Sequence, residues 1–149
     1  MKIMYGFSSH LMLDCFGCAK DKLADVNFVF DLLVSLPQKL KIAKTAEPFV
    51  FKYQGQASEE WGVSGVLLAG MAHVSIHTFP DKEQVFIDIF SAQEFDADFM
   101  VAEFNRLFSA TSCEVSLRNN ELLVNNGFDN PYGLVERSER GFYANLSGN

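Results

Sequence analysis

The stretch from Gly62 to Asp81 reads GVSGVLLAGMAHVSIHTFPD and decides the fold class. Residues 72–79 within it alternate between apolar or small side chains on one side and polar or aromatic side chains on the other. Residues 84–91, QVFIDIFS, alternate in the same way. A period of two is typical of a strand with one buried face. We therefore predict strands at about 63–68, 72–79 and 84–91, joined by short connections.

Two segments carry a helical period instead. Leu23, Val26, Phe30 and Leu33 share one helical face, and Pro37 predicts the end of that helix. A second helix is predicted from the apolar positions Met100, Phe104, Leu107 and Phe108.

The remaining segments favour strands. We predict a short strand at 10–14, a strand over 42–53 interrupted by Pro48, and a hairpin around Asn119-Asn120 that joins 115–117 to 122–124. The tail from Asn125, rich in Gly and Asn, is predicted to be irregular. Two helices with six or seven strands give an α+β, two-layer sandwich, with an antiparallel-rich sheet and both main helices on one face.

Composition limits the function classes. The 149 residues predict one domain spanning 1–149. A net charge of −7, without a basic patch, disfavours nucleic acid and anionic membranes as partners. The fullest apolar run, residues 66–72, is far shorter than the roughly 20 residues of a membrane span. With no signal-like N-terminus, we expect a cytoplasmic protein.

The cysteines leave alternatives open. Cys15 and Cys18 form a C-x-x-C pair, which is compatible with metal or redox chemistry, but Cys113 stands alone and a zinc site needs about four ligands. A chain of this size does not need disulfides. We therefore expect two small, buried or half-buried thiols at 15 and 18 and no metal site.

The stretch 62–81 resembles the central motif of the prokaryotic S-adenosylmethionine decarboxylases, the small pyruvoyl enzymes of spermidine synthesis. In that family Gly-Val-Ser-Gly is followed by Glu-Ser-His and then by Ile-His-Thr-Trp-Pro-Glu. The resemblance includes His10-Leu11, Asp14 and Gly17-Cys18 upstream and extends over about residues 8–108, without contribution from 109–149. It implies the family's sandwich fold and a homodimer.

The resemblance also shows three departures at positions with chemical roles. A pyruvoyl group forms when a Ser hydroxyl attacks the preceding carbonyl and β-elimination cuts the chain; its carbonyl then serves as the electron sink for decarboxylation. Ala72 stands at the position of that Ser, and Met71 stands at the position of the Glu that precedes it. Ala92 stands at the position of the proton-donating Cys. The resemblance therefore implies that no pyruvoyl cofactor forms at Ala72.

Other family positions are kept. Ser64 and His77 match the residues that assist self-processing, and His73 matches the His after the cleavage site. Phe79 replaces a Trp that packs near the purine, and Asp81 replaces a Glu that resembles the ligand of the ribose hydroxyls. These residues are the candidate ligand-binding set.

The leading hypothesis is a pseudoenzyme of polyamine metabolism that binds an S-adenosylmethionine-like or polyamine-type small molecule, or regulates a catalytic paralogue. One alternative is an active decarboxylase with an atypical site, for which Ser75 and Ser91 are the nearby hydroxyls. Another is a structural remnant without a ligand. An Ala72 introduced by engineering to trap a precursor is a further reading.

Overall fold

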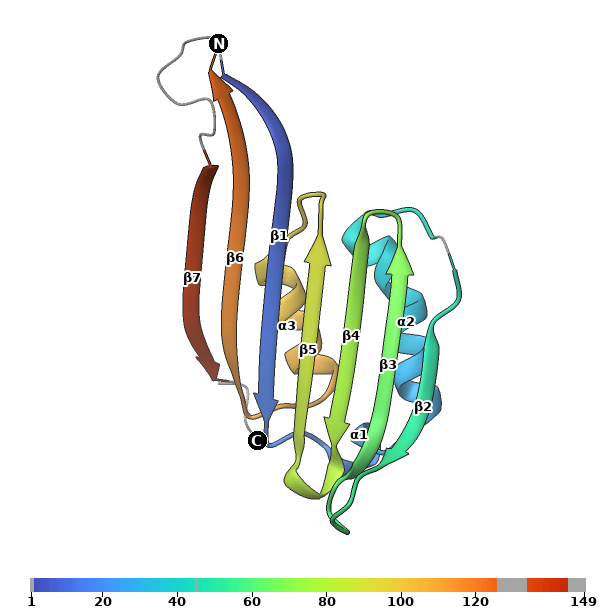
Figure 1. Cartoon of the computed structure of the whole chain (residues 1–149). Coiled ribbons are helices and arrows are strands. Elements are labelled where there is room, and N and C mark those ends of the chain that lie inside the picture. The colour runs from blue at the N-terminus through green and yellow to red at the C-terminus, as the bar shows by residue number, and fades with distance from the viewer. Residues whose placement is uncertain (1, 45, 126–133, 145–149) are drawn as a thin grey trace.

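The computed structural model describes residues 2–44, 46–125 and 134–144, with side chains described between residues 8 and 119. Seven antiparallel strands form one sheet in the order β2-β3-β4-β5-β1-β6-β7 (Figure 1). Their bounds are β1 Lys2–Phe16, β2 Phe49–Gln54, β3 Trp61–Ala69, β4 Ala72–Phe79, β5 Gln84–Ser91, β6 Ser112–Asn125 and β7 Leu134–Ala144. The predicted bounds of β4 and β5 agree with the structure at both ends.

The helices lie on one face of this sheet (Figure 1). They are α1 (Lys20–Leu23), α2 (Val26–Leu40) and α3 (Ala97–Leu107), with the short 3-10 helix η1 at Pro80–Lys82. Asp25 caps α2 by accepting hydrogen bonds from the N–H groups of Asn27 and Phe28, and Asp96 caps α3 through the N–H of Phe99. The two-layer α+β sandwich is confirmed. No helix among the described residues is long and apolar enough to cross a membrane.

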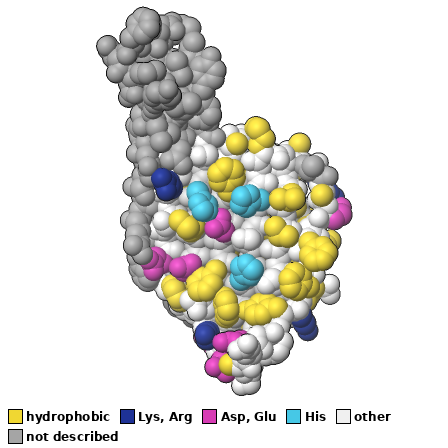
Figure 2. Space-filling model, in the orientation of Figure 1, with side chains coloured by type: hydrophobic (Ala, Val, Ile, Leu, Met, Phe, Trp, Pro, Cys, Tyr) yellow, Lys and Arg dark blue, Asp and Glu magenta, His cyan; other side chains and the backbone are white. Residues whose placement is uncertain are grey.

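The core lies between the helices and the covered face of the sheet. Leu33 and Leu36 of α2 and Phe104 of α3 are fully buried against the inward residues of the strands, such as Ile76 and Ile87. The opposite face of the sheet, which we call the open face, carries the residues of each strand that alternate with the buried ones. All three histidines of the chain lie on it among apolar side chains (Figure 2).

The first long helix differs from its prediction in two ways. It continues through Pro37 to Leu40, because a proline this close to the helix end removes only the bond to the carbonyl of Leu33 in the last turn. Its buried face contains Val29, Leu32 and Leu33, whereas Phe30 is only half-buried. The break at Asp25 separates Leu23 from this helix, so the predicted stripe across 23–33 is wrong.

Four further predictions, three on strands and one on the tail, are also corrected. Residues 42–44 and 46–47 are not part of a strand, and β2 begins at Phe49, directly after Pro48. Asn119-Asn120 does not turn the chain, because β6 runs through it while paired to β1 along its length. The tail from Asn125 contains β7, which pairs with β6. The short strand predicted at 10–14 is the middle of the longer β1, whose residues before Ser9 pair with β6 and not with β5.

Cys15 and Cys113 form a disulfide, so the expectation of two thiols at 15 and 18 is wrong for Cys15. The β1–β6 register places the two cysteines directly opposite each other, with Cα atoms 4.1 Å apart. Cys18 remains a buried thiol, and burial followed by the negative charge of Glu83 raises its pKa to about 12.

Candidate functional site

Ser64 and His77 form a hydrogen-bonded pair on the open face. They lie opposite each other in the β3–β4 register, with Ser64 Oγ 3.0 Å from His77 Nδ1. Ser64 is 8% exposed, whereas His77 is open to solvent. This is the geometry in which an imidazole exchanges a proton with a hydroxyl. The structure therefore brings together the two residues that the sequence singled out as retained.

Close packing explains the glycines beside this pair. A Cβ at Gly62 would lie 2.0 Å from the carbonyl oxygen of Thr78, and one at Gly65 would lie 2.7 Å from Leu33 of α2. Thr78 Oγ1 accepts a hydrogen bond from Val63 N at 2.8 Å and donates one to the carbonyl of Leu23 at 2.7 Å. These contacts hold β3, β4 and α1 together directly behind Ser64 and His77.

The three positions at which the resemblance implies a substitution lie together at the far end of β4. The β3–β4 turn consists of Gly70 and Met71, and Ala72 starts β4 opposite Ser91. Ala92 N donates a hydrogen bond to the carbonyl of Met71 at 3.0 Å. Met71 is 66% exposed, whereas Ala72 is only 6% exposed and belongs to the covered side of the alternation. Position 72 is thus a buried methyl group beside an exposed turn.

This end of β4 is remote from the Ser64–His77 pair of the same chain. Ala72 and His77 are five residues apart, which corresponds to about 16 Å along an extended strand. They also lie on opposite faces of the sheet, because residues an odd number of positions apart in a strand point to opposite faces. Within one chain, the retained pair and the substituted positions do not form one constellation.

The candidate ligand-binding residues take separate places. His73 stacks on Phe90, with ring centroids 5.2 Å apart and 19° between the planes. Phe79 makes edge contacts with Tyr53 and Phe86. The open face therefore presents aromatic surface at both ends of β4.

Asp81 lies beyond the strand in η1 and is already engaged. Its carboxylate accepts a hydrogen bond from Trp61 Nε1 at 2.8 Å and lies 2.9 Å from Lys20 Nζ. The hydrogen bond from Lys20, then that from Trp61, lowers the pKa of Asp81. To contact a ligand, this carboxylate would have to share or exchange these partners.

Sequence reasoning gave no site role to His10 and Asp88, which the structure pairs. His10 Nε2 lies 2.6 Å from Asp88 Oδ1 on the open face. A cavity of about 310 Å³ beside them is lined by residues that include His77, Phe86 and Asp88. The sequence signal for this pair is that His10 and Asp88 each lie on the side of their strand that faces away from the core. This signal predicts a contact only when β1 is known to lie next to β5. No group of three or more His, Cys, Asp or Glu side chains suited to a metal ion occurs within the described parts of the chain.

Comparisons with a family model and with individual proteins indicate the same family. The sequence model for S-adenosylmethionine decarboxylase matches residues 9–120. A relative from Clostridium botulinum (strain Langeland), named S-adenosylmethionine decarboxylase proenzyme, is 32% identical over 112 residues, covering 73% of this chain and 91% of the relative. A protein of the same name from Syntrophomonas wolfei is 29% identical over 148 residues, covering 96% of this chain and 100% of the relative. The similarity therefore extends past residue 108, where the sequence motifs end.

Proposed function

This chain belongs to the S-adenosylmethionine decarboxylase family, and from that premise we propose that it serves polyamine metabolism without forming the family's pyruvoyl group. It binds an adenosyl or polyamine-type small molecule on the open face, or regulates a catalytic paralogue by pairing with it. The observation that carries this proposal is the buried methyl group at position 72, next to Met71 and Ala92.

The residues present do not fit a pyruvoyl group. An alanine has no Oγ to attack the carbonyl of Met71, so neither the ester nor the cleavage that follows it has an origin at this position. Ala92 has no ionisable hydrogen with which to protonate a substrate carbanion, and Met71 has no carboxylate. No decarboxylation step therefore passes through position 72. Ser91 is not a substitute, because its Oγ donates to the carbonyl of Gln93 at 2.6 Å.

The surface beside the Ser64–His77 pair supports ligand binding. Phe79, Tyr53 and Phe86 form an edge-to-face aromatic group near His77, on which a purine ring would find a stacking partner. The cavity lined by His77 and Asp88 adds a carboxylate, which a ligand amino or sulfonium cation would share with His10. Without a covalent anchor the affinity is modest, with a dissociation constant of about 0.1–1 mM.

The open face also supports a homodimer. Its apolar side chains include Phe49 at 68% exposure and Leu68 at 60%, with Phe51 and Val66 nearby in the same alternation, and Met12 on the same face farther along the sheet in β1. Adjacent exposed apolar residues of this kind favour a protein interface. Packing two open faces together would also bring the Ser64–His77 pair of one copy toward the chain of the other.

Calorimetric titration with S-adenosylmethionine and with methylthioadenosine tests the ligand. We expect saturable binding that Phe79→Ala weakens, because this substitution removes the aromatic ring next to Tyr53 and Phe86. Phe99→Ala is the matched control, since Phe99 is an exposed aromatic on α3. The absence of heat at millimolar ligand, or equal effects of the two substitutions, would remove the binding proposal.

Sedimentation tests the assembly independently. We expect a dimer for the native chain and a monomer for Leu68→Lys, which places a charge in the apolar part of the open face. Val34→Lys is the control, because Val34 is also apolar and exposed, although at 37%, but belongs to α2. A native monomer at micromolar concentration would contradict the proposed dimer and leave the ligand test intact.

A further inference from the structure

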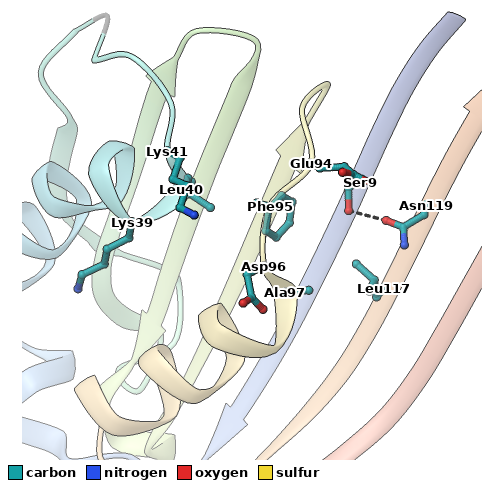
Figure 3. A pocket seen from close by; sticks show the side chains of 10 residues that line it. All are labelled: Ser9, Lys39, Leu40, Lys41, Glu94, Phe95, Asp96, Ala97, Leu117 and Asn119. Atoms are coloured by element: carbon teal, nitrogen blue, oxygen red, sulfur yellow. Dashed lines mark hydrogen bonds between the residues drawn. The ribbon is translucent and has the colours of Figure 1, made fainter. Parts of the chain in front are cut away.

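A second cavity, of about 520 Å³, lies on the helix-covered side of the sheet, away from the open face. It is bounded by the end of α2, by residues 94–97 that lead into α3, and by the inward residues of β1 and β6 (Figure 3). We propose that this cavity binds a free amino acid, held at both its ammonium and its carboxylate groups. The proposal is independent of the ligand assigned to the open face, because the sheet separates the two cavities.

The charges that line the cavity are of opposite sign, and two of them are left for a ligand. Lys39 is engaged by Glu103, with Nζ 3.5 Å from Oε1, and Asp96 is engaged as the cap of α3. The side chains of Lys41 and Glu94 make no ion pair with each other or with any other described residue, although both line this cavity. One cation and one anion therefore remain within a single pocket.

Neutral polar groups complete the wall on the sheet side. Ser9 is almost fully buried, and its Oγ donates to Asn119 Oδ1 at 2.7 Å. This bond fixes the side-chain amide of Asn119 and leaves its NH₂ group as a donor without an acceptor among the described residues (Figure 3). Leu40, Phe95 and Leu117 provide the apolar lining.

This combination selects a ligand class. A diamine needs two available carboxylates, and a phosphate compound needs cations or a row of N–H donors. One ammonium and one carboxylate in a cavity that also has an apolar lining instead complement a zwitterion with an apolar side chain. The cavity volume lies within the range of small-molecule sites, which bury apolar ligand surface and fix it with a few polar groups. We therefore assign the ligand carboxylate to Lys41 and the ligand ammonium to Glu94.

The probes are L-leucine, L-methionine and L-phenylalanine, titrated by calorimetry and by thermal shift. We expect at least one of them to bind and to raise the melting temperature. Its methyl ester and its N-acetyl derivative should each bind about tenfold more weakly, because each loses one charge-assisted contact. Putrescine and inorganic phosphate should bind less well than the amino acid.

Matched substitutions place the ligand in the cavity. Lys41→Gln and Glu94→Gln should each weaken binding about tenfold. Lys41→Gln should have no further effect on the methyl ester, and Glu94→Gln should have none on the N-acetyl compound. Lys44→Gln and Glu47→Gln are the controls, because these two residues form an exposed ion pair just beyond α2 and outside the cavity. Circular dichroism and the melting temperature without ligand confirm that every variant is folded.

Two results would overturn the proposal. The first is the absence of binding by all three amino acids at millimolar concentration. The second is binding that the control substitutions weaken as much as Lys41→Gln and Glu94→Gln do. Tighter binding of putrescine or phosphate would likewise contradict the assignment of one cation and one anion to the ligand.

Discussion

The hydroxyl of Thr78 joins β3, β4 and α1, and replacing Thr78 by Val removes it with little change of shape. Two backbone groups lose their partner, the N–H of Val63 and the carbonyl of Leu23, and both residues are fully buried. Each unsatisfied buried group costs about 1–3 kcal/mol, so the free energy of unfolding should fall by about 2–6 kcal/mol. For a chain of this size the melting temperature should fall by about 5–15 °C.

Urea denaturation, followed by the fluorescence of the only tryptophan, Trp61, measures this loss. Thr78→Ser is the matched control: it keeps the hydroxyl, loses one methyl group, and should cost about 1 kcal/mol. A Val variant as stable as the native chain, or a Ser variant less stable than the Val variant, would show that these two hydrogen bonds do not hold the strands behind Ser64 and His77.

Further predictions concern the cysteines and position 72. Reducing the Cys15–Cys113 disulfide should lower the free energy of unfolding by about 2–4 kcal/mol, and an unchanged melting curve with reductant would contradict this. Cys18 should resist iodoacetamide in the folded protein at neutral pH, since burial raises its pKa to about 12; the folded state binds this proton more tightly, so stability should fall as the pH rises from about 9 toward 12. Alkylation of Cys18 at the rate of a solvent-exposed thiol would contradict its burial. Combining Ala72→Ser with Met71→Glu restores the attacking hydroxyl, but the Ser64–His77 pair of the same chain lies about 16 Å away on the opposite face, so self-cleavage should be slow and partial. A folded but uncut double variant would contradict this prediction.

The central strands could be predicted because the features that define them involve residues close together in the sequence. The alternation in 72–79 and 84–91 fixes both the strands and their buried faces. A two-residue turn at Gly70-Met71 also fixes the pairing, because each step back along β3 matches one step forward along β4. Ser64 therefore lies opposite His77, and this central pair of the site could be predicted from the sequence.

Long-range pairing explains what the sequence did not reveal. Asn119-Asn120 favours a turn locally, but β1 offers backbone partners to β6 on both sides of these two residues, and tertiary pairing overrides the local preference. The same register creates the Cys15–Cys113 disulfide between residues 98 positions apart. The His10–Asp88 pair likewise depends on β1 lying beside β5. The helix-side cavity combines residues from α2, from the segment before α3 and from two distant strands, so no local motif marks it.

Intact-mass spectrometry of the purified, native chain tests the central claim most directly. An alanine at position 72 cannot start self-processing, so we predict one uncut species near 16.7 kDa. Two fragments that separate between Met71 and Ala72, or release of CO₂ from S-adenosylmethionine by the homogeneous protein, would contradict the proposal that this family member forms no pyruvoyl group.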